Sequence, residues 1–389
     1  MKFRLLLLIS LLAAFPPLST DMYIPAIPLL REQWGQPLVV INLTLIGFFI
    51  SYCVFLLVYG PVSDRYGRKR PLMVGIGIYI VASLICAVST GIHMMIAARL
   101  VQAAGAASGS ALSLAICKDL FDAKSRERVM AHIAVIMALA PMMAPIIGSW
   151  VIFWSSWRWV FVIQALMGGV AFLGVYRMTE SLKTFNTVSP RKVIGVYLRL
   201  LGNGRYISLL LAMSLLVFPL FAFIAGSSEI YMTHFGLGER TFGIFFGANA
   251  MASMFGAIAF GRLSPHIRME NLVAVSFAGI MAAGLWMLLE PHHSPWSLAL
   301  PMGAMTFFFG LNRPPTNNLI LEQVDRDVGA ASSLLVFTFM ILGALSMGIV
   351  SLQWADKITV LGTMGAVTGC LTFVFWLRFK SVFLAVYEG

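Results

Sequence analysis

Long apolar stretches separated by short polar segments are the feature that most constrains the fold of this chain. They recur along all 389 residues, and about twenty helical residues are enough to cross the ~30 Å hydrocarbon core of a bilayer. Hydrophobic residues make up 59% of the chain and charged residues only 11%, whereas charged residues reach about a quarter of a soluble domain. The sequence therefore predicts an all-α membrane protein.

The apolar stretches predict twelve transmembrane helices, which places both termini on one side of the membrane. Of the Lys and Arg residues, 21 lie in the termini and the alternate loops on that side, and four lie in the opposite loops: Arg31, Arg158, Arg240 and Lys357. Lys and Arg are enriched in cytoplasmic loops, so we expect both termini in the cytoplasm. The twelve predicted spans cover residues 5–30, 38–59, 71–90, 93–116, 129–153, 158–178, 206–233, 241–261, 271–290, 296–320, 329–352 and 359–379.

The first span could be mistaken for a secretory signal peptide. Lys2 and Arg4 precede an apolar run from Leu5 to Phe15, as in a signal sequence. The run continues to Leu30 without a clear cleavage site, long enough to cross the membrane. We therefore expect this segment to stay in the protein as its first helix.

Residues 60–70 join the second and third predicted spans and hold a dense cluster of charge. Pro61 and Gly67 are expected to interrupt the flanking apolar runs, and Arg65 and Arg68 belong to a group of four cations. The lone carboxylate, Asp64, needs a partner or a helix end to stabilise it. We expect Asp64 to pair with nearby Arg side chains and to cap the helix that starts near residues 327–331.

The chain is predicted to divide into two halves. Its longest hydrophilic stretch, about residues 179–205, is rich in Lys and Arg and separates six predicted spans from six. The pattern Gly60-x-x-Ser63 with Arg68 returns as Gly261-x-x-Ser264 with Arg268, at the equivalent loop of the second half. We therefore expect two parallel six-helix bundles, residues 1–178 and 206–389, joined by a cytoplasmic linker at 179–205.

Two motifs carry a family resemblance. The spacing of Gly60, Asp64, Arg65, Gly67 and Arg68 resembles the signature loop of the major facilitator superfamily, in which this loop acts as a conformational switch. The run Leu18-Ser19-Thr20-Asp21-Met22-Tyr23-Ile24-Pro25-Ala26-Ile27-Pro28 resembles the bicyclomycin-resistance type (Bcr/CflA) drug/proton antiporters. The resemblance implies the major facilitator fold and a bacterial inner-membrane location.

Asp21 and Arg99 are the predicted proton-coupling residues. A carboxylate within a span costs about 2.5–3.5 kcal/mol on insertion scales, so Asp21 is a functional candidate, unless it has reached the outer headgroups. Both residues are expected in the outer half of the bilayer, close enough to meet. We therefore expect Asp21 to carry the proton and Arg99 to be its partner.

Two further helices support the resemblance. Arg99, Gln102 and Gly105 are similar to the family's R-x-x-Q-G-x-G motif, with Ala103 in place of its first Gly. Residues 140–149 resemble the antiporter motif of proton-coupled exporters. In that motif the prolines bend the helix and the small residues allow close packing. Its key members here are Pro141, Ala144, Pro145 and Gly148.

The second half departs from the family pattern. Glu229 stands in a run that is usually apolar, and Asn312-Arg313 precedes a double proline. Glu229 either lies at the outer water interface or faces the cavity, and Arg313 either lines the cavity or forms an ion pair in the cytoplasmic half. The predicted substrate cavity comprises Tyr23, Gln102, Glu229, Asn312 and Arg313, with an apolar wall from Phe48, Tyr52, Met213 and Phe245.

The sequence therefore predicts a secondary transporter that exports a small molecule in exchange for protons by alternating access. No nucleotide-binding Gly-rich loop and no spaced metal-ligand set occurs, so neither cofactor nor metal is expected. A dedicated exporter of one metabolite or siderophore remains an alternative, and a membrane enzyme or a passive channel is disfavoured. Expected partners are the substrate, protons and membrane lipid, with no nucleic acid and a monomeric chain.

Overall fold

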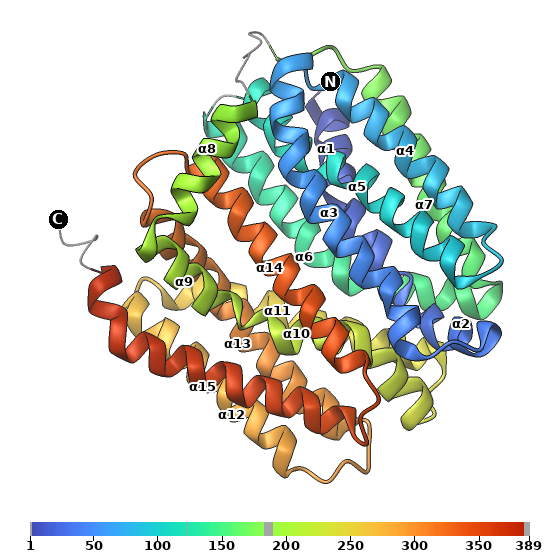
Figure 1. Ribbon diagram of the computed structural model, residues 1–389, viewed down its shortest axis with the longest axis vertical. Helices are drawn as coiled ribbons and strands as arrows, with labels where there is room; N and C mark the ends of the chain where they lie inside the picture. The colour runs from blue at the N-terminus through green and yellow to red at the C-terminus, as the bar shows by residue number, and fades with distance from the viewer. Residues whose placement is uncertain (1, 122, 183–189, 385–389) are drawn as a thin grey trace. The chain divides into compact units, whose positions relative to one another are not determined.

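The computed structural model describes residues 2–121, 123–182 and 190–384, and these form helices and connecting segments without any β-strand (Figure 1). The helices are α1 (Lys2–Asp21), η1 (Ile24–Ala26), α2 (Ile27–Trp34), α3 (Leu38–Tyr66), α4 (Lys69–Ala87), α5 (Ile92–Leu120), α6 (Ala123–Trp154), α7 (Trp157–Tyr176), α8 (Pro190–Leu201), α9 (Gly204–Ser214), α10 (Val217–Ser228), η2 (Glu229–His234), α11 (Glu239–Leu263), α12 (Met269–Leu289), α13 (Trp296–Glu322), α14 (Val328–Ser351) and α15 (Lys357–Leu384).

Ten of the described segments are long and apolar enough to cross a membrane, so the protein is a multi-pass membrane protein. The first of them, Leu5–Trp34, combines α1, η1 and α2. The predicted spans at 129–153 and 296–320 are helical but are not among the ten: the described apolar part of α6 is Leu139–Trp154, and α13 carries the polar run 312–318. The count of twelve therefore stays a prediction.

The helices divide into two compact units. Unit 1 comprises residues 1–193 with 238–244, and unit 2 comprises 194–237 with 245–389. In unit 1, α5 packs against α1, α3 and α4, α4 packs against α7, and α6 packs against α1. In unit 2, α12 packs against α13 and α15, and α10 packs against α14 and α15. Each unit thus has its own helical core.

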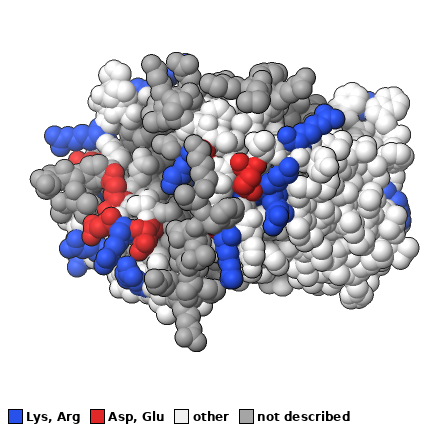
Figure 2. Space-filling view, turned by 90° about the horizontal axis from the view of Figure 1, so that it is seen from above, with Lys and Arg blue, Asp and Glu red and all other residues white. Residues whose placement is uncertain are grey.

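Charged side chains of both signs are exposed on the face that Figure 2 shows. Lys and Arg lie there beside Asp and Glu, next to wide areas without charged side chains. The predicted linker, 179–205, contains the helix α8 and the beginning of α9, while its residues 183–189 lie outside the described part of the chain. The hydrophilic composition had not predicted these helices.

Candidate functional site

The first span is broken next to Asp21. Asp21 is the last residue of α1, and the chain turns through Met22 and Tyr23 before η1 begins. Pro25 occupies one of the first two positions of η1, where the missing backbone N–H of proline has no cost. Asp21 is 6% exposed, and its Oδ1 accepts a hydrogen bond of 2.8 Å from the Thr20 hydroxyl. The structure therefore places a buried carboxylate at a helix break, where sequence reasoning had expected a continuous helix.

Arg99 stabilises the end of this broken helix. The last carbonyls of a helix lack intrahelical donors, and cations are favoured beside them. Arg99 Nη1 donates to the carbonyl of Ser19 at 2.9 Å, and Gln164 Nε2 donates to the carbonyls of Leu18 and Ser19 at 3.2 and 3.4 Å. Side chains from α5 and α7 thus satisfy the carbonyls that the break in α1 leaves open.

Gln102 connects these groups into one buried network. Its Oε1 accepts from Arg99 Nη1 at 2.6 Å, and its Nε2 donates to Gln164 Oε1 and Ser83 Oγ, each at 2.8 Å. All four side chains are fully buried, so Gln102 faces other polar side chains of unit 1 rather than an open space. Gln164 and Ser83 were missed from the sequence because each is a single uncharged polar residue in an apolar helix.

Aromatic rings surround the Arg99 guanidinium. Its Cζ lies 4.4 Å from the ring centroid of Phe48, 5.1 Å from that of Tyr23 and 5.9 Å from that of Phe161. Tyr23 also exchanges a 3.0 Å hydrogen bond with the Thr44 hydroxyl. The predicted cavity residue Tyr23 and the predicted wall residue Phe48 therefore belong to the cage around Arg99.

Arg99 does not contact Asp21 directly in this structure, and its role as the partner of Asp21 in proton coupling stays a prediction. Arg99 Nη1 is taken by Ser19 and Gln102, and Nε and Nη2 have no acceptor among the described residues. No ion pair joins the two residues, although both belong to the same buried region of the described chain. The break in α1 gives Arg99 backbone carbonyls to bind, and the rings occupy much of its remaining surface.

The motif in α6 packs directly against the break in the first span. A Cβ added at Gly148 would overlap the carbonyl oxygen of Met22, so only glycine permits this approach. Ala144 is fully buried in the same helix, and Pro141 and Pro145 lie within α6 without ending it. The small residue at 148 thus brings the predicted antiporter motif into contact with the residue next to Asp21.

The basic loop is shorter than predicted. α3 continues past the predicted end of the second span at residue 59, through Gly60 and Pro61 to Tyr66, and only Gly67 and Arg68 separate α3 from α4. No atom lies within 4 Å of a Cβ built at Gly60. Gly67 has a φ of 86° and no room for a side chain beside Glu180, so the turn requires glycine there.

Arg68 is the centre of an ion-pair cluster. Its guanidinium contacts Asp64 Oδ1 at 2.6 Å, Ser63 Oγ at 2.6 Å and Asp119 Oδ2 at 3.0 Å. Arg65 is exposed and lies over the Tyr66 ring. The predicted contact of Asp64 with the helix near 327–331 would join the two units and stays a prediction. Asp119 was missed because a single acid near a helix end resembles an ordinary exposed residue.

Glu180 anchors the turn from the opposite side. Its carboxylate accepts hydrogen bonds from the backbone N–H groups of Arg68, Lys69, Ser181 and Leu182. Partial burial acts to raise the pKa of Glu180, but these four bonds outweigh it and hold the pKa below its usual value. Glu180 lies in the stretch that had been assigned to the linker, and sequence reasoning missed its role.

The predicted charged residues of unit 2 lie on two elements. Glu229 is half-buried and begins the π-helix η2. Asn312 is 2% exposed, and its Oδ1 accepts from the Thr316 hydroxyl at 3.1 Å. Arg313 is half-buried, with its Cζ 5.7 Å from the ring centroid of Phe309 and 5.2 Å from that of Phe339.

The predicted wall residues of unit 2 lie among apolar and aromatic neighbours. Met213 is buried in α9, and Phe245 packs against Tyr231 and Trp296.

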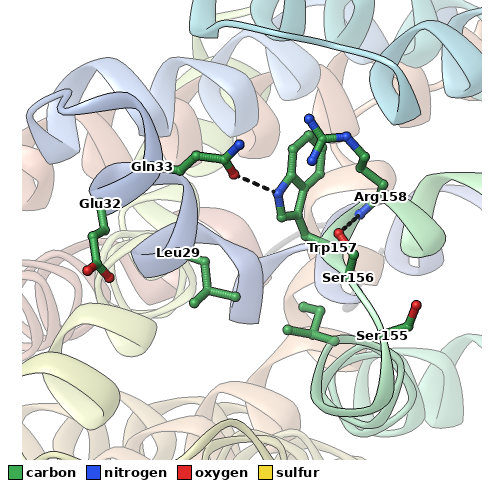
Figure 3. A pocket seen from close by; sticks show the side chains of 8 residues that line it. Leu29, Glu32, Gln33, Ser155, Ser156, Trp157 and Arg158 are labelled. Atoms are coloured by element: carbon green, nitrogen blue, oxygen red, sulfur yellow. Dashed lines mark hydrogen bonds between the residues drawn. The ribbon is translucent and has the colours of Figure 1, made fainter.

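One open pocket in unit 1 lies apart from the predicted residues. It has a volume of about 440 Å³ and is lined by α2 and by the connection between α6 and α7. Figure 3 shows Gln33 pointing toward Trp157, whose Nε1 donates to Gln33 Oε1 at 3.0 Å, while the Glu32 side chain points away from that bond. None of the predicted site residues lines it, so the candidate functional site remains the region around Asp21 and Arg99.

Comparisons with known proteins agree with the architecture. The family model described as Major Facilitator Superfamily matches residues 9–347. The chain belongs to the major facilitator superfamily. A crystal structure of a D-xylose-proton symporter, 12% identical, superposes with a TM-score of 0.75 over 95% of this chain and 97% of that one. The fold is therefore that of a major facilitator transporter, and the protein is a transporter rather than an enzyme.

Two curated relatives carry names from drug resistance. The "Bicyclomycin resistance protein homolog" of Haemophilus influenzae is 27% identical over 373 residues, covering 94% of this chain and 93% of the relative. "Multidrug resistance protein D" of Escherichia coli is 28% identical over 312 residues, covering 79% and 77%. These similarities confirm the predicted resemblance to the bicyclomycin-resistance type family.

Proposed function

We propose that the protein exports small molecules, with drugs among them, across the bacterial inner membrane in exchange for protons by alternating access. The observation that carries this proposal is Asp21, a buried carboxylate at a break in a transmembrane segment. Ionisable residues within a membrane are costly and are retained where they serve transport. Broken helices in transporters supply backbone groups beside ion and substrate sites.

The surroundings of Asp21 suit a proton carrier. Its single hydrogen-bond partner among the described side chains is the uncharged Thr20 hydroxyl, which can hydrogen-bond to either protonation state of the carboxyl. Arg99 holds the neighbouring Ser19 carbonyl, so a change in the charge of Asp21 acts on the same helix end. We propose that Arg99 senses the protonation of Asp21 through this helix end and through the Gln102 network.

The remaining assignments complete the proposal. We propose two six-helix bundles, residues 1–178 and 206–389, with a linker at 179–205 and both termini in the cytoplasm, and a monomer that works in the lipid bilayer. This topology places Trp150, Trp154 and Trp159 at the outer membrane–water interface. Their exposed side chains support it, because Trp is enriched at such interfaces. Residues 60–68 would form the conformational switch, with Asp64 favouring one state.

Transport assays with purified protein in proteoliposomes test the coupling. A growth-inhibition panel in a strain without its own exporters, which begins with bicyclomycin, first identifies a compound that the protein exports. That compound is then used in the transport assay. We expect Asp21→Asn to abolish uptake driven by a pH gradient but to retain counterflow of the labelled compound, because Asn preserves size and hydrogen bonding but cannot titrate. Thr20→Val, which keeps the carboxylate, should retain gradient-driven transport.

Two results would change the proposal. Gradient-driven transport by Asp21→Asn at the wild-type rate would remove Asp21 from the coupling step. Protection against no drug in the panel, together with counterflow of a single metabolite, would favour the dedicated exporter.

A further inference from the structure

Arg313 lies deep in α13, and no described residue of its unit is a polar partner of its guanidinium. It is about 26 Å along the helix from Trp296 and about 14 Å from Glu322, at 1.5 Å per residue. Within its own unit, no acidic side chain that the structure describes forms an ion pair with it, and no described residue accepts a hydrogen bond from its guanidinium. A cation at such a depth is costly unless something neutralises it.

The two phenyl rings do not supply that neutralisation. Phe309 and Phe339 lie near the guanidinium, at 5.7 and 5.2 Å from Cζ to the ring centroids. Cation–π contacts of this kind contribute about 0.5–2 kcal/mol. A guanidinium, however, carries five N–H donors in its plane, and ring faces cannot satisfy all of them. The rings therefore hold the group in place and leave its donors available.

The neighbouring residues add a surplus of hydrogen-bonding groups. Asn312 Nδ2 is buried and has no acceptor among the described residues. Asn317 lies one turn after Arg313, on the same face of α13, and its buried Oδ1 has no donor among them. The face of α13 that holds Arg313 thus offers donors at residue 313 and an acceptor at 317, while Asn312 projects from the adjacent face. Such a set matches a ligand that has an anionic group and an N–H or O–H group.

Apolar side chains continue from the same phenyl ring. Phe309, Met302, Met305 and four further apolar side chains, with Thr306, surround a gap too narrow to hold a water molecule. Methionine side chains adapt readily to different apolar shapes. Adaptable apolar side chains therefore lie beside a group that binds anions.

We propose that Arg313 binds the carboxylate of the transported compound, and that the protein therefore handles amphipathic organic acids and zwitterions in addition to neutral compounds. A carboxylate can receive two parallel N–H bonds from one guanidinium, and this bidentate geometry is among the strongest in proteins. The proposal rests on the proposed export function for its physiological meaning. The binding step itself requires no proton gradient.

A matched pair of fluorescent ligands tests the proposal. Dansylphenylalanine and its methyl ester share their aromatic groups and the sulfonamide N–H and differ in the carboxylate. Binding of each is titrated to the full-length protein in phosphatidylcholine nanodiscs, with no gradient present. We expect the wild type to prefer the acid. Arg313→Ala should weaken binding of the acid about tenfold to hundredfold and leave the ester unchanged.

Two variants serve as controls. Arg205→Ala removes an exposed cation from the same unit and changes the net charge by as much as Arg313→Ala does. Because Arg205 is not part of the proposed site, this variant should keep the wild-type preference for the acid. Arg313→Lys keeps the charge but loses the planar fork, so the preference should fall only partly. It also reports on the site if Arg313→Ala does not fold.

Several outcomes would overturn the proposal. They are failure of the acid to bind, equal binding of acid and ester by the wild type, or an unchanged preference in both Arg313 variants. If phosphatidylglycerol in the nanodiscs abolishes the preference, a lipid phosphate is the occupant and the proposal fails. If the wild type shows no proton-driven export but still prefers the acid, the proposed function is rejected and the proposed binding site is retained.

Discussion

The two intramembrane arginines differ in what surrounds them. Arg99 in unit 1 is fully buried, donates to Ser19 and Gln102, and lies among three aromatic rings. Arg313 in unit 2 is half-buried and contacts two phenyl rings, with no polar partner among the described residues of its unit. An arginine whose bonds go to a helix end supports the structure of that end. An arginine with none of its donors paired within its unit is suited to a ligand.

The comparison predicts that the two arginines contribute very differently to stability. Arg99→Ala removes two charge-assisted hydrogen bonds, leaves Gln102 Oε1 without its donor and leaves the Ser19 carbonyl with only the 3.4 Å bond from Gln164. This loss should cost about 3–6 kcal/mol. Arg313→Ala should change stability by less than about 1 kcal/mol, because it removes a costly unpaired cation. Thermal unfolding followed by a thiol-reactive dye measures both, since three of the four cysteines are buried. Equal losses of stability would contradict the distinction.

The packing around the unit 1 site gives the next largest effect. Gly148→Ala forces a methyl group onto the Met22 carbonyl, and overpacking of this kind costs about 1–3 kcal/mol. We expect transport to fall at least tenfold because the break beside Asp21 is displaced. Gly169→Ala, in α7, has no atom within 4 Å of the new methyl group and is the matched control. Wild-type transport by Gly148→Ala would show that this contact is dispensable.

The aromatic rings test what each arginine does. Phe48→Leu removes the ring closest to Arg99 and should lower stability by about 0.5–2 kcal/mol. Phe339→Leu, beside Arg313, should leave the melting temperature nearly unchanged and weaken binding of the dansyl acid severalfold. The melting temperature and the affinity for the dansyl acid are both measured on each variant. The comparison breaks down if Phe339→Leu destabilises the protein as much as Phe48→Leu does.

The smallest expected effect concerns Glu180, which anchors the loop of unit 1. Because its pKa is lowered in the folded state, its stabilising contribution is present above the ordinary glutamate pKa, near 4.3, and is lost as the pH falls through the lower folded value. Glu180→Gln should therefore have a lower melting temperature than the wild type at pH 7, and the difference should shrink below about pH 4. A difference that is constant from pH 7 to pH 3 would assign the effect to packing.

The corresponding loop of unit 2 shows why an internal repeat predicts position better than contacts. The sequence pairs Gly60, Ser63 and Arg68 with Gly261, Ser264 and Arg268. In the structure Arg68 is buried against two carboxylates, whereas Arg268 is exposed and lies 3.8 Å from Glu270. Repeated spacing locates equivalent loops, but the burial of each cation depends on partners from distant helices, such as Asp119.

Much of the fold was predictable because crossing a membrane demands long apolar segments. The break after Asp21 was not, since the apolar run passes through it and prolines can either bend or restart a helix. Gly148 was predicted as a site of close approach, but its neighbour Met22 was not. Gln164 was missed because hydrogen bonding of a buried amide leaves no periodic pattern in the sequence.

The central claim is that Asp21 exchanges a proton when the substrate binds. The most direct test is proton release on addition of a transported compound to purified protein in weakly buffered detergent solution, with no membrane and no gradient. We predict release by the wild type and none by Asp21→Asn, with binding of the compound retained. Proton release of equal size from both proteins would contradict the account.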